Sequence, residues 1–268
     1  KCEFAVREVQ FLGHHVTAGG ILPLPEKVVA VQEHPRPGTV KQLQAFLGVV
    51  NFYRRFVPAA AKILRPLTDS LKGSPKSTAA VEWTAEMVKA FTSAKAALCQ
   101  AALLAHPRQG WELALMVDAS ADHVGAALQQ RETASSPWQP LAFFSKKLEP
   151  VQVRYSAFDR ELFACCAGIR HFRYMLEGRL FTIYTDHKPL TFALSKVADA
   201  WTAMQCRQLS YVAEFTTDIR HVPGVDNVVA DTLSRPPSPD STGPDSSPLL
   251  SDAGPDSSLL LSNAGPDS

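Results

Sequence analysis

The segment Trp111-Glu-Leu-Ala-Leu-Met-Val-Asp-Ala-Ser-Ala-Asp-His-Val-Gly-Ala-Ala-Leu-Gln-Gln130 decides the fold. Apolar side chains alternate with others from Leu113 to Val117, which is the pattern of a half-buried strand. A short turn leads into a second strand over 124–130, and a third strand follows over 141–145. Three strands joined by short connections predict an antiparallel meander.

The residues after this meander are predicted to form helices and strands in alternation. A long helix is predicted to begin at the capping residue Ser156 and to end at Gly178, with one apolar stripe. A fourth strand, two helices, a fifth strand and a final helical turn follow over 180–185, 188–194, 202–214, 215–222 and 227–233. The fold class is therefore α/β, with a five-stranded sheet and flanking helices.

The residues before the meander are predicted to be mostly helical. A short hairpin over 8–13 and 20–22 surrounds a Thr-Ala-Gly-Gly turn. A helix over 40–57 follows, in which Thr39 and Gln42 have the spacing of a capping box and Pro58 stops the helix. A second helix is predicted over 86–98.

Composition excludes several classes of protein. The chain has 268 residues, 46% apolar and 20% charged, and five cysteines without a C-x-x-C pair. This argues against a disulfide framework or a zinc module and fits a reducing compartment. No apolar stretch reaches the ~18 residues that span a bilayer. The first residues, Lys-Cys-Glu-Phe, are neither a signal peptide nor a start methionine, so we expect a piece of a longer polyprotein.

Charge is unevenly distributed along the chain. Residues 1–76 carry a net charge of +6, and residues 236–268 carry −5. A basic front end favours a polyanionic partner, with a solvated surface as the alternative. The 236–268 segment repeats Gly-Pro-Asp-Ser at an 11-residue period and is predicted to be a disordered tail.

Four acidic residues stand at the boundaries of apolar elements: Asp118, Glu161, Asp186 and Asp231. Converging carboxylates repel one another unless cations lie among them, and oxygen-only ligands favour Mg²⁺ or Mn²⁺ over zinc. Two such ions about 4 Å apart are the arrangement that cleaves phosphodiesters. Taken singly, each acid is more typical of a surface cap or an ion pair, and periodicity alone does not show that the four meet.

The sequence resembles the ribonuclease H domain and the preceding reverse-transcriptase region of gypsy-type long-terminal-repeat retrotransposon Pol polyproteins. The matching blocks of the ribonuclease H domain are 117–130, 144–148, 155–162, 184–190 and 221–235. The upstream blocks are 1–4, 11–14, 46–56, 66–68 and 83–84, so the resemblance covers about 1–235.

The resemblance implies a ribonuclease H-like mixed sheet in which Asp118, Glu161, Asp186 and Asp231 bind two Mg²⁺ or Mn²⁺ ions. The implied reaction is hydrolysis of the RNA strand of an RNA–DNA hybrid. His221 matches a mobile histidine that assists proton transfer or product release in cellular ribonucleases H, and the alternative is a solvated loop histidine.

The resemblance also implies a domain order. Residues 1–75 would form a palm-end hairpin and thumb-like region, 76–107 a connection segment and 108–235 the ribonuclease H-like domain. In the thumb-like region, Lys41, Arg54 and Arg55 would contact the nucleic-acid backbone, with a basic solvated helix face as the alternative.

The family's polymerase motif, Tyr-x-Asp-Asp, does not occur in this chain, so DNA synthesis by these residues alone is not expected. The expected partners are an RNA–DNA hybrid and a polymerase palm upstream in the same polyprotein, without a membrane. The expected location is intracellular, in the cytoplasm or nucleus within a retroelement particle. The alternatives are a non-catalytic nucleic-acid-binding remnant and a fragment that acts only as part of a larger reverse transcriptase.

Overall fold

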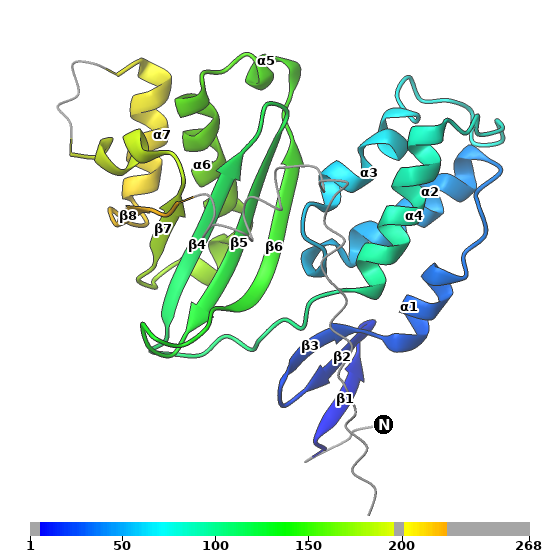
Figure 1. Cartoon of the computed structure of the whole chain (residues 1–268), viewed down its shortest axis with the longest axis horizontal. Helices are drawn as coiled ribbons and strands as arrows, with labels where there is room; N and C mark the ends of the chain where they lie inside the picture. The colour runs from blue at the N-terminus through cyan, green and yellow to red at the C-terminus, as the bar shows by residue number, and fades with distance from the viewer. Residues whose placement is uncertain (1–5, 196–200, 224–268) are drawn as a thin grey trace, which may run out of the picture. The chain divides into compact units, whose positions relative to one another are not determined.

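The computed structural model describes residues 6–195 and 201–223, and its elements are labelled in Figure 1. All of the described residues belong to one compact unit. The predicted tail over 236–268 and the predicted helical turn over 227–233 lie outside the described residues. No helix in the described part of the chain is long and apolar enough to cross a membrane.

A mixed five-stranded sheet with the order β6-β5-β4-β7-β8 confirms the predicted fold class. Its strands are β4 (Glu112–Ala119), β5 (His123–Arg131), β6 (Gln139–Lys147), β7 (Thr182–Thr185) and β8 (Ile219–His221). The first three strands form the antiparallel meander, whereas β7 pairs with β4 and with β8 in parallel.

The predicted fifth strand over 215–222 is too long. Phe215 and Thr216 instead continue the turn that closes the preceding helix, since both backbone amides donate to the carbonyl of Val212. The Thr216 hydroxyl then donates to the carbonyl of Phe181. Strand pairing therefore begins only at Ile219.

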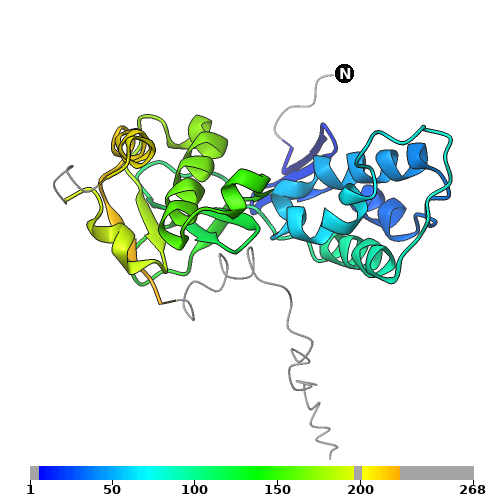
Figure 2. The ribbon, with the colours of Figure 1, turned by 90° about the horizontal axis from the view of Figure 1, so that it is seen from above.

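Two helices, α6 (Ala157–Leu176) and α7 (Ala203–Ala213), cover one face of this sheet (Figure 1, Figure 2). Ser156 caps α6 by accepting a hydrogen bond from the amide of Asp159, as predicted. Gly168 lies where α6 passes closest to the sheet, because a Cβ atom added there would lie 3.2 Å from the Cβ of Ala126. Two short helical segments, α5 (Pro150–Val153) and η2 (Lys188–Phe192), complete this part.

Four helices and a 3₁₀ turn precede this sheet: α1 (Pro25–Gln32), α2 (Val40–Phe52), η1 (Arg54–Phe56), α3 (Ala60–Asp69) and α4 (Ala85–Cys99). The capping box of Thr39 and Gln42 at the start of α2 is present as predicted. The predicted helix over 40–57 is too long, since α2 ends at Phe52 and the chain tightens into η1. Neither α1 nor α3 was predicted.

The small N-terminal sheet has three antiparallel strands, β1 (Glu8–Phe11), β2 (His14–Thr17) and β3 (Gly20–Pro23). The predicted hairpin is wrong in its pairing, because β2 lies between the other two strands and pairs with both. Gly20 is required at its position, since its φ is +150° and an added Cβ would lie 2.4 Å from the carbonyl oxygen of Leu104.

The helical region also packs against the five-stranded sheet. Met116, Ala127 and Phe143 lie opposite one another on β4, β5 and β6, and all three belong to the helical region's apolar cluster. The side chains that alternate with them pack on α6. Both faces of the meander are therefore buried, each against different helices.

Candidate metal centre

Three of the predicted acids lie together at one edge of the sheet. Asp118 is near the end of β4, Glu161 is in the second turn of α6, and Asp186 directly follows β7. One carboxylate oxygen from each lies within 4.8 Å of the others. Asp118 and Glu161 are buried, and Asp186 is half-buried.

The topology explains why these acids meet. Because β4 and β7 are parallel neighbours, their carboxyl ends lie at the same edge of the sheet. The helix α6 connects the meander to β7, and its first turns carry Glu161 to that edge. Residues almost seventy positions apart in the sequence are thus adjacent in space.

Glu161 is held by two hydrogen bonds. The backbone amide of Ala119 donates to Glu161 Oε1 at 2.9 Å, and the hydroxyl of Thr185 donates to Glu161 Oε2 at 3.2 Å. The same hydroxyl of Thr185, which is fully buried, accepts a hydrogen bond from the amide of His187 at 3.1 Å. Thr185 therefore connects the carboxylate on α6 to the turn that carries Asp186.

The electrostatics of the site favour a bound cation. Burial is the largest cause that raises the pKa of Glu161 to about 8, and the neighbouring charge of Asp118 raises it further, as does that of Asp186. The amide of Ala119 acts in the opposite direction. Three carboxylates with no nitrogen or sulfur ligand among them form the donor set that Mg²⁺ or Mn²⁺ prefers. The residues present therefore fit a hard divalent cation.

His221 lies next to this centre. It is the last residue of β8, where it pairs with Thr185 of β7, and its side chain is exposed. The position is therefore the end of a strand rather than the interior of a loop. Asp231, the fourth predicted acid, lies outside the described residues.

The predicted nucleic-acid contacts lie elsewhere, on the helical region. Lys41 is exposed in the first turn of α2. Arg54 and Arg55 are half-buried in η1, where Arg54 donates to the backbone carbonyl of Ser145 on β6. Arg55 lies against the ring of Phe56, with its guanidinium carbon 5.7 Å from the ring centre. Their contact with nucleic acid remains a prediction.

Sequence reasoning did not show that Thr185 donates to Glu161 or that Phe158 stacks on Trp201 near His187. The ring of Phe158 stacks on Trp201 at 5.2 Å and lies 6.0 Å from His187. The available signals were the position of Thr185 directly before Asp186 and the three-residue spacing from Phe158 to Glu161. Neither signal shows that Thr185 contacts Glu161 or that Phe158 contacts Trp201, because each contact joins elements that are far apart in the sequence.

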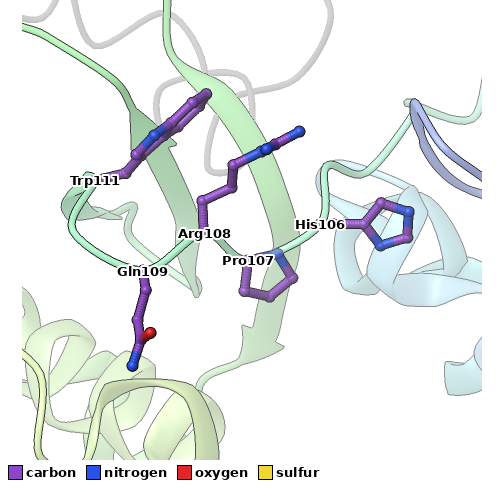
Figure 3. A pocket seen from close by; sticks show the side chains of 5 residues that line it. All are labelled: His106, Pro107, Arg108, Gln109 and Trp111. Atoms are coloured by element: carbon purple, nitrogen blue, oxygen red, sulfur yellow. The ribbon is translucent and has the colours of Figure 1, made fainter.

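A separate hollow of about 530 Å³ lies in the segment that precedes β4, and Figure 3 shows its lining side chains. They include His106, Arg108 and Trp111, and the guanidinium of Arg108 lies 5.4 Å from the ring of Trp111. His106 forms a hydrogen bond with the carbonyl of Thr17 at 2.7 Å. None of the three clustered acids lines this hollow.

Residues 83–183 match the family described as the RNase H-like domain found in reverse transcriptase. The chain is 34% identical to the Pol polyprotein of the transposon opus from Drosophila melanogaster, over 88% of this chain and 24% of that protein. It is 31% identical to the transposon Tf2-3 polyprotein of Schizosaccharomyces pombe, over 88% of this chain and 17% of that protein. The chain thus spans about a sixth to a quarter of these relatives.

Two solved structures share the fold. The foamy viral protease-reverse transcriptase in complex with an RNA/DNA hybrid has a TM-score of 0.67 and 22% identity, over 90% of this chain and 32% of that one. The same protein in complex with double-stranded DNA has a TM-score of 0.67 and 20% identity, over 81% of this chain and 45% of that one.

Proposed function

Because this chain is a relative of retrotransposon Pol polyproteins and contains an RNase H-like domain of the reverse-transcriptase type, we propose that it is a metal-dependent ribonuclease acting on RNA–DNA hybrids. The observation that carries the proposal is the cluster of Asp118, Glu161 and Asp186. Three carboxylates brought together from a strand, a helix and a second strand are costly to bury without a compensating cation.

In the proposed mechanism, Asp118, Glu161 and Asp186 hold two Mg²⁺ or Mn²⁺ ions, with Asp231 as a fourth ligand. When bound, the ions supply an activated water and stabilise the charge that develops on the phosphate. Glu161 must release its proton on binding, since its pKa is raised to about 8. His221 accepts or donates a proton beside the centre, from its exposed position at the end of β8.

The proposed substrate follows from the relatives. The foamy viral structure has this fold in a complex with an RNA/DNA hybrid. We extend that partner to this chain, with Lys41, Arg54 and Arg55 contacting the backbone of the duplex. A polymerase palm encoded upstream, as in Pol polyproteins, would complete a reverse transcriptase. An intracellular location in a retroelement particle belongs to the same proposal.

The test is cleavage of labelled RNA in an RNA–DNA hybrid with Mg²⁺, comparing the wild type with Asp118→Asn. We expect the substitution to reduce the cleavage rate by at least about 100-fold, because it removes one of the charges that hold the ions. Glu132→Gln removes one negative charge at an exposed position in the turn after β5 and serves as the matched control.

Equal background cleavage by the wild type and Asp118→Asn would contradict the proposal. Hybrid binding that weakens steeply with salt, without cleavage in Mg²⁺ or Mn²⁺, would instead support a non-catalytic nucleic-acid-binding protein. The full-length control Glu132→Gln must cleave as the wild type does for the loss in Asp118→Asn to be assigned to the metal centre.

A further inference from the structure

A second hollow, of about 560 Å³, lies between α4 and the segment that follows α1. Its lining includes His34, Arg36, Lys95 and Cys99, together with glutamine and threonine side chains. No aspartate or glutamate is among the lining residues. The hollow is therefore bordered by cations, neutral hydrogen-bonding groups and the apolar side chains of Phe91 and Ala96.

The two cations of this hollow lie against aromatic rings. The guanidinium carbon of Arg36 lies 5.5 Å from the ring centre of Trp83, and the ammonium of Lys95 lies 5.0 Å from that of Phe91. Lys95 also donates to the carbonyl of His34 at 2.9 Å. Each cation–π contact is a modest attraction at a solvent-exposed site and leaves N–H donors for another partner.

The rings that support these cations are themselves fixed. Phe91 is buried, packs on Phe46 at 4.6 Å and lies 5.5 Å from Trp83. The indole N–H of Trp83 donates to the carbonyl of Pro37 at 2.8 Å. The rings that the two cations contact are therefore held by the core, which favours one position for each charge.

Within the described part of the chain, neither Arg36 nor Lys95 forms an ion pair. By contrast, Arg65, Arg131 and Lys147 each bind a carboxylate. Arg36 and Lys95 therefore border the hollow without a carboxylate partner among the described residues.

We infer that this hollow binds a phosphate-bearing ligand, contacted by Arg36 and Lys95. Its volume lies in the range of small-molecule sites and is large enough for pyrophosphate or one nucleotide of a single strand. Guanidinium and ammonium groups are the usual donors to phosphate oxygens. The site contains none of the three clustered acids, and the inference does not depend on nuclease activity.

Cys99 provides a direct probe of the charge at this site, because it is a free, exposed thiol on the lining. The probe is a pair of thiol-specific methanethiosulfonate reagents of opposite charge. Cys2→Ser and Cys206→Ser remove the other candidates for reaction, since Cys165 and Cys166 are buried. We expect the anionic reagent to react faster than the cationic one.

In Arg36→Gln/Lys95→Gln the ratio of the two rates should fall by about tenfold, because two nearby positive charges are lost. Lys27→Gln/Lys89→Gln is the matched control, since it removes two exposed charges, one from α1 and one from α4, without touching the lining. The charge-retaining variant Arg36→Lys/Lys95→Arg should keep the wild-type ratio. Circular dichroism checks that each variant is folded.

Ligand binding is then measured as protection of Cys99. Pyrophosphate and a short single-stranded DNA are titrated separately, and each should protect at concentrations about tenfold lower in the wild type than in Arg36→Gln/Lys95→Gln. Protection by pyrophosphate alone supports a free phosphate compound as the ligand, and stronger protection by DNA supports a nucleic-acid strand. Equal rates for the two reagents in the wild type, or no protection by either compound, would overturn the inference.

Discussion

At the scale of single residues, Glu161 is an ionisable carboxyl group that is buried, and this burial changes its pKa. Its folded pKa of about 8 lies well above its ordinary value of 4.5, chiefly because of burial. The folded state therefore holds the proton more tightly than the unfolded state does. This contribution to stability is complete below about pH 4.5 and is lost as the pH rises through about 8.

Glu161→Gln should therefore be more stable than the wild type at alkaline pH when metal is absent. We expect a gain of about 2 kcal/mol in the free energy of unfolding at pH 9 and a smaller difference at pH 6. The amide oxygen can still accept from the amide of Ala119, and the amide nitrogen can donate to the hydroxyl of Thr185, which reverses the direction of that bond. Urea unfolding at the two pH values with a chelator measures the effect. The same difference in unfolding free energy between the two proteins at both pH values would contradict it.

Thr185 should act on the metal centre through Glu161. Thr185→Val removes the hydroxyl that donates to this carboxylate and accepts from His187, so we expect a 10- to 100-fold loss of Mn²⁺ affinity by calorimetry, on the order seen for groups that orient metal ligands. Thr185→Ser retains the hydroxyl and should restore binding.

Thr182→Val is the matched control for this prediction. Thr182 lies on the same strand, and its hydroxyl donates to Asp218 at 2.7 Å, away from the three acids. Its substitution should lower stability without changing Mn²⁺ affinity. An equal loss of affinity in both valine variants would show that Thr185 acts only through the stability of β7.

The acids themselves could be predicted from the sequence, since Asp118 and Asp186 stand where apolar strands end and Glu161 stands near the start of an apolar-striped helix. Their proximity in space could not be predicted from the sequence, because it depends on the parallel pairing of β4 with β7. Asp231 lies outside the described residues, so its part in the centre remains a prediction.

At the scale of elements, the packing of α6 on the sheet depends on Gly168. A methyl group there would lie 3.2 Å from the Cβ of Ala126, which is anchored to the backbone of β5 and cannot rotate away. We expect Gly168→Ala to destabilise the protein by about 1 kcal/mol, since the strain exceeds the gain in helix propensity.

Gly48→Ala offers the matched comparison. Gly48 lies inside α2, and no atom lies within 4 Å of an added Cβ. Alanine there should raise stability by about 0.5–1 kcal/mol through helix propensity alone. Thermal unfolding of both variants measures the contrast, and stabilisation of similar size in both would show that α6 adjusts freely.

Local signals explain which helices were predictable. Thr39 and Gln42 form a capping box at the start of α2, and Thr84 caps α4, so the N-terminus of each helix is marked in the sequence. The helix α3 begins instead after Ala59, which has a φ of +52° and no capping side chain, and it contains Pro66. Its buried residues Ala60, Leu64 and Leu67 do recur at helical spacing, but the missing cap and the internal proline argue against a helix at the sequence level.

At the scale of the whole molecule, the helical region and the five-stranded sheet share a buried interface. Phe143 is only 5% exposed and belongs to the cluster formed with the helices. The hydroxyl of Ser145 accepts a hydrogen bond from the amide of Ala61 at 2.9 Å, and the backbone carbonyl of Ser145 accepts one from Arg54. Ion pairs of Lys147 with Asp69 and of Arg65 with Asp122 lie at the same interface.

Residues 108–235 expressed alone should therefore be less stable than the full chain. The truncation exposes Met116, Ala127 and Phe143, so we expect a loss of several kcal/mol in the free energy of unfolding and stronger binding of a hydrophobic dye. Denaturant unfolding measures this loss. Removal of 236–268 alone is the control and should leave stability unchanged, and an equally stable 108–235 fragment would contradict the prediction.

The parallel pairing of β4 with β7 also sets the order in which the centre can be completed during synthesis. A ribosome adds about 5–20 residues per second, so Asp118 leaves the exit tunnel several seconds before Asp186. Throughout that interval the nascent chain has no complete carboxylate cluster. The helices that bury Phe143 are translated earlier, so they are available to shield the meander before β7 pairs with β4.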